Sequence, residues 1–550
     1  MDKIFRSEIS DNSHLCELEN LTIANYALQR LKSRIEVLGD KPWLVDTVKG
    51  KEILFKDVEC RARSVGSALS RRGFAKGDSV QIVSSDVVDA TLLQTAVWLI
   101  GGFTRNCCTD DSPEEIARQM KQIECKFVVA DKETMQKVTD VLKLLDFKCS
   151  VITIGDNLSV KNSVKFTDLI SDDGSAFPET EIDGREDAIL VCNTSGSTGH
   201  PKGVVHTHHS ILSTVAVFEG NLPIDAKSDV FLCTNTFTIS YAWMCIVSLA
   251  IGFSVHTMGK FKKELLLEHL LKYRTPNVSF YPYIGSWFVR ILETTKHDFS
   301  FIKEISFGGG VLDTTTFHIL KKYLPNVAIN QTYASTECLG IAKTFNKDGK
   351  KLNIKITPEG ESLASNGFLF PSVEVKIADF DTGELLDENQ LGKLYVRSKF
   401  LLKGYLGVNG KMDRSCLDAE GWFDTGDMAF VDEEGELFVR ERVSFMFVYI
   451  NRRVIPSEIE ALLLEHPAVQ MVCVLGVPHV DTNYQATAFV VLKRGKLATE
   501  DELKRIVARK LPEHKHLHGG VQFVESLPEN RGGKLDRIAV WKKHCHRFQA

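Results

Sequence analysis

The sequence predicts an α/β protein: a large N-terminal domain of parallel-rich sheets flanked by helices, with a small β-rich subdomain, and a smaller α+β C-terminal domain. The 550 residues, 43% of them hydrophobic, are ample for a large core but too many for one compact domain. Short apolar stretches of strand length alternate with helical periodicity, which is typical of parallel sheets covered by helices. After about Asp387, the segments GKLYVRSKFLLKGYLG and GELFVRERVSF are dense in β-formers and glycine instead.

Individual elements of the large domain follow from local patterns. Phe55–Arg72 has helical periodicity, and residues 73–86 (GFAKGDSVQIVSSD) predict a turn followed by a strand. Three short apolar runs, Phe127–Asp131, Val151–Gly155 and Ala188–Cys192, have the length and composition of buried strands. We therefore expect parallel strands connected through helices in this part of the chain.

One long uncharged stretch requires a choice between membrane and core. No Asp, Glu, Lys or Arg occurs between Asp229 and Lys260. A membrane-spanning helix needs about 20 predominantly apolar residues, but polar side chains fill the first half of the stretch: Thr234, Asn235, Thr236, Thr238 and Ser240. The apolar run Tyr241–Phe253 has the length of a buried helix, so we expect it in the protein core, as the wall of an apolar pocket.

The C-terminal part has two helix-start signals. Ser457-x-x-Glu460 and Thr499-x-x-Glu502 both match the capping box, in which a hydroxyl side chain and an acid three residues later cap a helix. The second predicted helix has three apolar residues on one face: Leu503, Ile506 and Val507.

Strand signals complete the C-terminal unit. Met471–Leu475 and Thr487–Leu492 are rich in β-formers and lie between the two predicted helices. The change of pattern near Arg442–Ser444 marks the boundary between the domains. We accordingly divide the chain into an N-terminal domain, residues 1–442, and a C-terminal domain, residues 443–550.

Composition narrows the classes of function. The net charge of −5 provides no excess of positive charge for nucleic acid or an anionic membrane. The thirteen cysteines include no C-x-x-C pair, and the first residues, MDKIFR, lack the apolar core of a secretory signal, which together predict a reducing compartment. Cys107-Cys108 and His544-Cys545-His546 contain metal-ligand types without a second ligand cluster nearby, and we interpret both as structural or incidental.

The stretch NTSGSTGHPKGVVHTHHS, residues 193–210, has the composition of a phosphate-binding loop. Its glycines let backbone N–H groups approach an anion, its hydroxyls add donors, and Lys202 supplies a positive charge. The apolar strand before it favours this interpretation over a flexible Gly/Ser linker. Neither the nucleoside-triphosphatase pattern G-x-x-x-x-G-K-S/T nor the dinucleotide pattern G-x-G-x-x-G fits, because Pro201 and Gly203 flank the lysine and the glycine spacing differs.

The order of residues in this loop resembles the phosphate loop of adenylate-forming enzymes. This superfamily comprises acyl-CoA synthetases, 4-coumarate–CoA ligases, beetle luciferases and peptide-synthetase adenylation domains. The resemblance implies that these loop residues bind the phosphates of ATP: Thr194, Ser195, Gly196, Ser197, Thr198, Gly199 and Lys202. His208 falls where the family's loop is followed by a histidine-containing helix start.

Further motifs of the same family follow along the chain. Ser306–Gly310 resembles the glycine turn that lies against the adenine ring, which makes Gly310 a candidate nucleotide contact. The segment QTYASTE, residues 331–337, resembles the signature Gly-Tyr-Gly-x-Thr-Glu. By that resemblance, the nucleotide and metal contacts of this segment are Gln331, Thr332, Thr336 at the α-phosphate, and Glu337 as the ligand of Mg²⁺.

Three more motif residues come from the C-terminal half. Residues 421–427 (GWFDTGD) match the family's ribose motif, in which Asp427 would accept hydrogen bonds from both ribose hydroxyls. Arg442 matches the arginine just ahead of the interdomain hinge. The segment LPENRGGKLDR, residues 527–537, resembles the C-terminal catalytic motif, with Lys534 at its lysine. The resemblance therefore extends over nearly the whole chain.

The resemblance implies an ATP-dependent acid–thiol ligase. Such an enzyme activates a fatty or aromatic carboxylic acid as an acyl-adenylate and then transfers the acyl group to CoA, with ATP, Mg²⁺ and CoA as cofactors. Lys202, Thr336, Glu337 and Lys534 would be the catalytic residues, with Lys534 bridging the carboxylate and the charge that develops at the α-phosphate. In the family the C-terminal domain is mobile and swings about the hinge between the two half-reactions.

The hinge region departs from the family pattern. Ser444 stands at the hinge position, Val448 where the family has a second lysine, and Asn451 where it has glycine. The histidine expected near an apolar pocket falls on Thr238 or Ile239. Since the hinge departures affect the second half-reaction, two alternatives stay open. One is a degenerate paralogue that binds nucleotide or acyl ligand, or adenylates, without efficient CoA transfer; the other is a luciferase-type monooxygenase.

The expected partners are small molecules, the carboxylic acid and CoA, with no nucleic acid and no transmembrane segment. The sequence does not indicate the oligomeric state or which acid is used. The chain ends in Phe548-Gln549-Ala550, which differs from the peroxisomal tripeptide Ser-Lys-Leu. We therefore expect a cytoplasmic protein, with a peroxisomal location by another route as the alternative.

Overall fold

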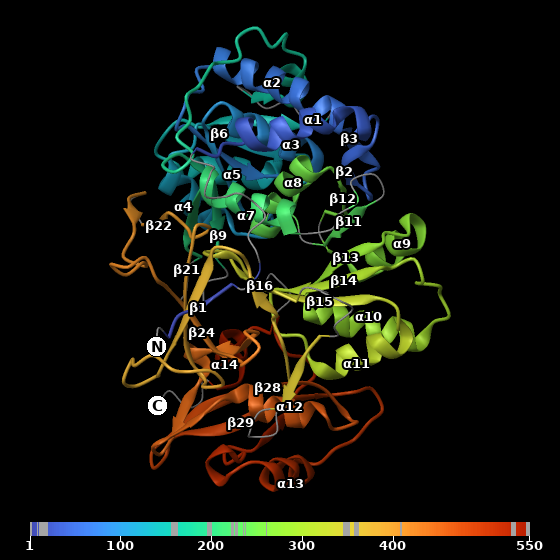
Figure 1. Cartoon of the computed structure of the whole chain (residues 1–550), viewed down its shortest axis with the longest axis vertical. Helices are drawn as coiled ribbons and strands as arrows, with labels where there is room; N and C mark the ends of the chain where they lie inside the picture. The colour runs from blue at the N-terminus through green and yellow to red at the C-terminus, as the bar shows by residue number, and fades with distance from the viewer. Residues whose placement is uncertain are drawn as a thin grey trace.

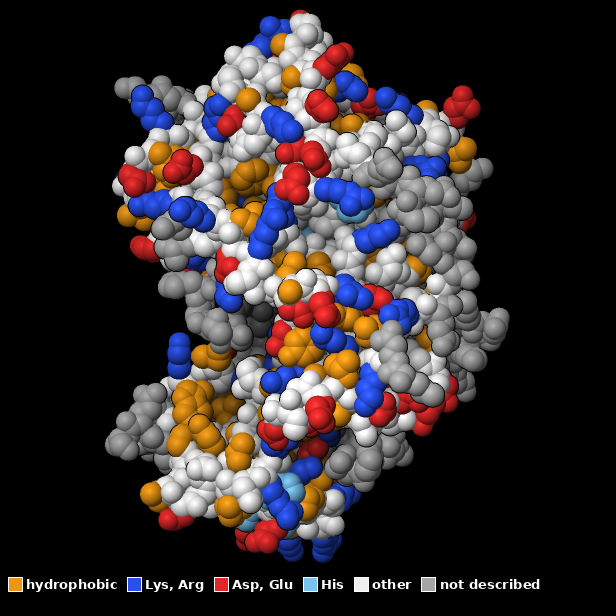
Figure 2. All heavy atoms as spheres, turned by 60° about the vertical axis from the view of Figure 1, so that its left-hand side comes forward, with side chains coloured by type: hydrophobic (Ala, Val, Ile, Leu, Met, Phe, Trp, Pro, Cys, Tyr) orange, Lys and Arg blue, Asp and Glu red, His pale blue; other side chains and the backbone are white. Residues whose placement is uncertain are grey.

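A computed structural model describes residues 3–7, 9, 20–155, 163–194, 201–221, 225, 229–234, 236, 238–259, 261–344, 352–356, 362–407, 410–529 and 535–545. The chain forms a large body of sheets and helices and a smaller body, drawn in orange and red at the bottom of Figure 1. This arrangement confirms the predicted α/β class. On the face shown in Figure 2, acidic and basic side chains are interspersed.

The first large sheet has the strand order β23-β22-β10-β9-β5-β4-β6-β7-β8 in the described residues. Its strands are β4 (Ser79–Val83), β5 (Phe103–Asn106), β6 (Phe127–Asp131), β7 (Ser150–Ile154), β8 (Ser163–Lys165), β9 (Ala188–Asn193), β10 (Gly203–Thr207), β22 (Gly404–Leu406) and β23 (Met412–Asp413). Strands β9, β5, β4, β6 and β7 are parallel to their neighbours in that series, whereas β10 is antiparallel to β9. The predicted strands of this region are confirmed.

Helices follow the strands of this sheet as a parallel arrangement requires. They are α2 (Phe55–Arg71), α3 (Val87–Leu99), α4 (Pro113–Ile123), α5 (Met135–Lys143), α6 (Phe166–Ile170) and α7 (His208–Asn221). The predicted helix at residues 55–72 is thus confirmed, with one residue less at its end.

A second large sheet has the order β19-β16-β15-β14-β13-β11-β12-β2-β3. Its strands are β2 (Pro42–Asp46), β3 (Lys51–Leu54), β11 (Val230–Cys233), β12 (Ser254–Thr257), β13 (Asn277–Phe280), β14 (Glu304–Gly308), β15 (Ala328–Ser335), β16 (Leu339–Lys343) and β19 (Phe368–Leu369). The helices of this part are α1 (Gln29–Leu38), α8 (Ile239–Ile251), α9 (Lys263–Tyr273), α10 (Pro282–Thr294) and α11 (Thr314–Tyr323).

Helix α8 confirms the prediction that the uncharged stretch contributes a buried helix. Nearly all its residues from Tyr241 onward are buried, and Trp43 donates its indole N–H to the carbonyl of Cys245 at 3.2 Å. Trp243 packs edge-on against Phe218 of α7, with ring centroids 4.5 Å apart. Within the described part of the chain, no helix combines the length and apolar character needed to cross a membrane.

The β-rich subdomain is a sheet of order β1-β20-β21-β24-β25, with strands β1 (Phe5–Arg6), β20 (Val373–Ala378), β21 (Gly392–Ser398), β24 (Phe423–Val431) and β25 (Leu437–Arg442). A separate hairpin pairs β17 (Ile354–Ile356) with β18 (Ser362–Ala364). Strand β1 pairs antiparallel with β20, which places the N-terminus beside strands from far along the chain (Figure 1).

The small body is one mixed sheet with helices against it. Its elements are β26 (Phe447–Tyr449), β27 (Arg452–Val454), α12 (Pro456–Leu464), β28 (Val469–His479), β29 (Asn483–Leu492), α13 (Glu500–Lys510), β30 (Val521–Phe523) and α14 (Arg537–His544). Both predicted strands are confirmed inside the longer β28 and β29. The boundary proposed between residues 442 and 443 lies between β25 and β26.

The two predicted helix starts have different outcomes. The Thr499 hydroxyl accepts from the N–H of Glu502 at 3.2 Å, and Leu503 and Val507 are buried with Ile506 packed beside them, as predicted. The capping box at Ser457 is wrong: α12 begins at Pro456 after Ile455, without a side-chain cap. Proline has a fixed φ that suits the first helical position and needs no partner for an N–H.

Candidate active site

The predicted site residues in the described part of the chain lie on six strands or directly beside them. Thr194 follows β9, Lys202 precedes β10, Gly310 follows β14, Gln331 and Thr332 lie on β15, Thr336 and Glu337 follow β15, Asp427 lies on β24, and Arg442 ends β25. Ser195, Gly196, Ser197, Thr198, Gly199 and Lys534 lie outside the described residues.

The two ends of the predicted phosphate loop are joined by backbone hydrogen bonds. Asn193 pairs with Gly203 across the antiparallel strands β9 and β10. The N–H of Thr194 donates to the carbonyl of Lys202 at 3.0 Å, and the N–H of Lys202 donates to the Thr194 hydroxyl at 3.3 Å. These contacts fix the points from which the loop leaves and re-enters the sheet.

Asp427 is held from two sides. The Tyr333 hydroxyl donates to its Oδ2 at 2.5 Å, and Arg442 Nε lies 3.0 Å from its Oδ1. Arg442 also donates to the carbonyl of Thr425 at 2.7 Å, which ties β25 to β24. Burial and the neighbouring carboxylate of Asp427 raise the pKa of Tyr333 well above its ordinary value. Tyr333 therefore stays protonated and donates a hydrogen bond to an ionised acid.

A second tyrosine holds the second predicted carboxylate. The Tyr405 hydroxyl, on β22, donates to Glu337 Oε1 at 2.9 Å, and the Nζ of Lys202 lies 5.0 Å from the centroid of the Tyr405 ring. Burial, followed by the Glu337 carboxylate, raises the pKa of Tyr405 above its ordinary value. The structure thus brings Lys202 and Glu337 together through one side chain of the neighbouring strand.

A buried histidine supports the turn that carries Thr336 and Glu337. His206 Nε2 lies 2.7 Å from the carbonyl of Thr336, and its Nδ1 lies 3.1 Å from the Ser210 hydroxyl. Because a carbonyl only accepts, the Nε2–H donates to it. Burial lowers the pKa of His206 to about 4, so the ring is neutral near pH 7.

Sequence reasoning identified His208 and missed His206. His208 starts α7, but its Nδ1 accepts from the N–H of Ile23 at 3.4 Å, on the side of the N-terminal segment. No local pattern distinguishes His206, whose role depends on a contact with a strand far along the chain.

Gln331 is a support of the glycine turn in this structure. Its side chain is fully buried, accepts from the N–H of Leu312 at 2.7 Å and donates to the carbonyls of Ala364 and Ser365 at 3.2 Å each. Gly310 is exposed, and a Cβ built on it would lie 3.2 Å from Pro282 Cγ. A side chain at Gly310 would therefore crowd the turn that Gln331 helps to shape.

The small body is joined to β25 by buried charges directly before Arg442. Arg440 pairs with Glu458 at 2.8 Å, with side chains 4% and 3% exposed. Arg537 Nη2 lies 2.8 Å from Glu441 Oε1, and the same guanidinium donates to both carboxylate oxygens of Glu460. These contacts tie helices α12 and α14 of the small body to the last strand of the large one.

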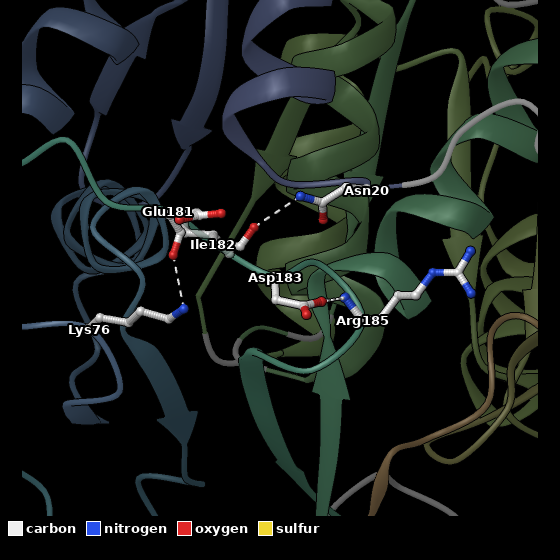
Figure 3. Close-up of a pocket in the computed structure, with 6 residues that line it drawn as sticks. All are labelled: Asn20, Lys76, Glu181, Ile182, Asp183 and Arg185. Carbon is white, nitrogen blue, oxygen red and sulfur yellow. Dashed lines mark hydrogen bonds between the residues drawn. The ribbon is translucent and has the colours of Figure 1, made fainter.

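Other features of the described residues lie away from this site. No group of three His, Cys, Asp or Glu side chains in them is arranged to hold a metal ion. Figure 3 shows a polar pocket lined by Asn20, Lys76, Glu181, Ile182, Asp183 and Arg185. Its wall is held together internally, since Lys76 donates to the carbonyl of Glu181 at 2.9 Å, and it contains none of the predicted site residues.

The fold and the order of these motifs define an adenylate-forming enzyme. The sequence pattern of the family described as AMP-binding enzyme matches residues 31–406, and that of the AMP-binding enzyme C-terminal domain matches residues 458–534. The chain belongs to the AMP-binding enzyme family.

Relatives cover nearly the whole chain. It is 28% identical over 547 residues to 4-coumarate-CoA ligase 1 of Narcissus pseudonarcissus, covering 98% of this chain and 95% of the relative. Its fold is similar to that of ATP-bound MatB from Rhodopseudomonas palustris, with a TM-score of 0.82, 23% identity and coverage of 95% of this chain and 100% of the other. A Mycobacterium tuberculosis fatty acyl CoA synthetase has a TM-score of 0.70 at 22% identity, with coverage of 95% and 99%.

Proposed function

We propose that this chain is an acid–CoA ligase. It would join a carboxylic acid to the α-phosphate of ATP with release of pyrophosphate, and then transfer the acyl group from AMP to the thiol of CoA. The observation that carries the proposal is the pair of tyrosine-held carboxylates, Asp427 and Glu337, with Lys202 over the ring of the tyrosine that holds the second. The 4-coumarate–CoA ligase relative supports CoA as the acceptor.

The predicted site residues would have distinct roles in the first half-reaction. Asp427 would bind the ribose hydroxyls, because a carboxylate only accepts hydrogen bonds and can accept several at once, and Tyr333 and Arg442 hold this one in place. Lys202 would hold the departing phosphates, and Thr336 would contact the α-phosphate. Lys534 would bridge the acid carboxylate and the α-phosphate, so that the two reactants are aligned and their charge is neutralised.

Glu337 is the proposed ligand of Mg²⁺. The donor set fits, because Mg²⁺ is usually held by one or two carboxylates together with substrate phosphates, and the Glu337 carboxylate is held by Tyr405, whose ring lies 5.0 Å from Lys202 Nζ. When bound, Mg²⁺ would offset the charge of the pyrophosphate. Tyr405 orients the carboxylate by its hydrogen bond to Oε1.

We further propose an apolar fatty or aromatic acid as the substrate and the cytoplasm as the compartment. The support for the substrate class is the apolar character of α8, at whose start the family's pocket histidine falls on Thr238, the N-cap, or on Ile239. A hydroxyl that caps its own helix, accepting from the N–H of Tyr241 at 3.3 Å, leaves this position without an ionisable group.

A second candidate function is adenylation without efficient CoA transfer. It is favoured by the turn after β26, where the exposed Ile450 has φ of 58°, a conformation that a β-branched residue rarely adopts. Val448 and Asn451 beside it are exposed and replace the family's lysine and glycine. A strained, apolar turn here differs from the segment that relatives use in the second half-reaction.

The deciding experiment measures the two half-reactions separately. Carboxylate-dependent exchange of pyrophosphate into ATP reports adenylation, and release of acyl-CoA reports transfer. Exchange together with thioester supports the ligase, and exchange without thioester supports the second candidate. No exchange over a broad panel of acids, despite measurable ATP binding, contradicts both. Lys534→Ala is the control that should lower exchange by about 10²–10³-fold.

A further inference from the structure

A buried arginine lies beneath the phosphate loop and is not among the family motifs. Arg105 on β5 is fully buried, and the acceptors of its guanidinium among the described residues are neutral. Nε and Nη2 donate to Asn193 Oδ1 at 3.2 and 2.8 Å, and Nη1 donates to the Gln119 carbonyl at 3.0 Å and Gln122 Oε1 at 2.9 Å. In the described part of the chain no carboxylate forms an ion pair with it.

Both ends of the phosphate loop rest on this guanidinium. Asn193 is the last residue of β9, directly before the loop, and its amide also donates to the carbonyl of Asn106 at 3.1 Å. A Cβ built on Gly203, where the loop re-enters the sheet, would lie 3.1 Å from Arg105 Nη2. Gly203 therefore lacks a side chain at the point where the guanidinium approaches.

The same network reaches the other predicted site residues. Gln122, at the end of α4, accepts from Arg105 and donates to the carbonyl of Gly407 at 3.0 Å. Gly407 directly follows β22, the strand that carries Tyr405. Arg118 of α4 donates to the carbonyl of Pro201 at 2.9 Å, but it is paired with Glu115 at 2.6 Å and so adds little net charge.

A buried charge without a counter-ion is costly, and proteins normally pair such a charge. Burial lowers the pKa of Arg105 to about 10, which still leaves it charged at pH 7. If the network were only structural, a neutral side chain would fill the site at lower cost. Glu115 and Arg118 also act on Arg105, but they pair with each other and their charges offset. An anion held by the phosphate loop would supply a counter-charge.

We propose that Arg105 is a positioning residue that holds the base of the phosphate loop and places a buried positive charge there, which favours the polyphosphate of ATP over less charged ligands. This inference rests on the proposed function, in which the loop binds ATP. The charge acts through the loop and without contact to the ligand, so its effect increases with the number of phosphates. At an effective dielectric constant of about 20, a charge that acts over about 12 Å would change affinity about tenfold for each unit charge on the ligand.

Three variants separate charge from structure. Arg105→Met removes both the charge and the hydrogen bonds. Arg105→Lys keeps the positive charge but loses the planar guanidinium, whose several N–H groups donate to Asn193, Gln119 and Gln122 at once. Gln122→Glu places a carboxylate against the intact guanidinium and keeps the hydrogen bond at 2.9 Å, although it loses the donation to the Gly407 carbonyl. Binding of ATP, ADP, AMP and adenosine to each full-length variant is measured by calorimetry without Mg²⁺, together with melting temperature.

The expected result is a loss graded by phosphate number. For Gln122→Glu and Arg105→Met, affinity for ATP falls at least tenfold more than affinity for AMP, and adenosine binds within about twofold of the parent. Arg105→Lys retains most of the preference for ATP. The inference would be overturned if the variants lost affinity for ATP and for adenosine equally. It would also be overturned if Gln122→Glu folded normally and preferred ATP over AMP as strongly as the parent. No nucleotide binding by the parent chain would instead refute the proposed function.

Discussion

Removing the hydroxyl of Tyr333 tests whether Asp427 is the ribose acceptor. In Tyr333→Phe the ring stays and only the hydrogen bond to Asp427 Oδ2, 2.5 Å long, is lost. Asp427 keeps its contact with Arg442, so the carboxylate stays in place but is restrained on one side less. The variant should therefore fold and bind ATP in the same place, with a less well-oriented ribose acceptor.

The size of the effect follows from the kind of hydrogen bond. A hydrogen bond to a charged group contributes about 1.5–3 kcal/mol, which corresponds to about 10- to 150-fold in affinity. Because Arg442 continues to hold Oδ1, we expect the lower end, a rise of about tenfold in KM for ATP. With 3′-deoxy-ATP, which lacks one of the two ribose hydroxyls, the rise in KM should be smaller. The ratio of the KM for 3′-deoxy-ATP to the KM for ATP should therefore be lower in Tyr333→Phe than in the parent.

Tyr405→Phe is a matched control, because it removes the same group from the other carboxylate. The lost bond to Glu337 is 2.9 Å long, and Glu337 is the proposed Mg²⁺ ligand. Pyrophosphate exchange is measured with both variants at varied ATP, 3′-deoxy-ATP and Mg²⁺. Tyr405→Phe should raise the Mg²⁺ concentration for half-maximal rate about tenfold and leave the discrimination between the nucleotides unchanged.

This assignment would be refuted if the two variants did not have separate effects on nucleotide discrimination and on Mg²⁺ dependence. If Tyr333→Phe and Tyr405→Phe changed the nucleotide discrimination and the Mg²⁺ dependence to the same extent, the two carboxylates would not have separate roles. If Tyr333→Phe left discrimination at the parent value in a well-folded protein, Asp427 would not be the ribose acceptor.

Three further predictions concern stability and the hinge. Burial lowers the pKa of His206 to about 4, below the value near 6.5 in the unfolded chain. The contribution of this neutral histidine to the free energy of unfolding should therefore be full above pH 6.5 and fall as the pH drops toward 4, by about 2 kcal/mol at pH 5. In urea unfolding, His206→Gln should remove that part of the stability difference between pH 7.5 and pH 5. Arg537→Met should cost about 3–5 kcal/mol, because it leaves Glu441 buried without its partner; a melting temperature equal to the parent's would contradict this. Val448 is 36% exposed and lies opposite Arg453, so Val448→Lys should fold, accelerate thioester formation and leave pyrophosphate exchange unchanged; no gain with CoA would argue against a role for this face.

Much of the fold could be predicted because burial leaves a clear pattern in the sequence. Strand β6 coincides with the predicted Phe127–Asp131, since a parallel strand covered on both faces is apolar throughout. The start of α12 could not be predicted from Ser457 and Glu460. The acid there accepts from the N–H of Val474 at 2.6 Å and from Arg537, and these tertiary contacts override the local capping signal.

The site was predictable as a set of motifs but not as a set of contacts. Thr194, Glu337 and Asp427 are recognised from the order of residues around them. Tyr405, which holds Glu337, and His206, which holds the Thr336 carbonyl, come from other strands. Their contacts depend on the strand order β22-β10-β9 and on the meeting of β10 with the turn after β15. Local patterns contain no information on such distant neighbours.

The joint between the two bodies has a composition suited to movement. Residues 440–442 carry three charges in succession, of which Arg440 and Glu441 pair with the small body and Arg442 pairs with Asp427 in the large one. If the small body rotates about Ser444, the first two pairs separate and their charges become hydrated. For ion pairs, the free energy lost when the partners separate is nearly balanced by hydration of the two charges. Apolar surfaces that separate instead cost about 25 cal/mol for each Å² exposed to water. A charged joint of this kind would permit two orientations of similar free energy, which the two half-reactions of the proposed function would require.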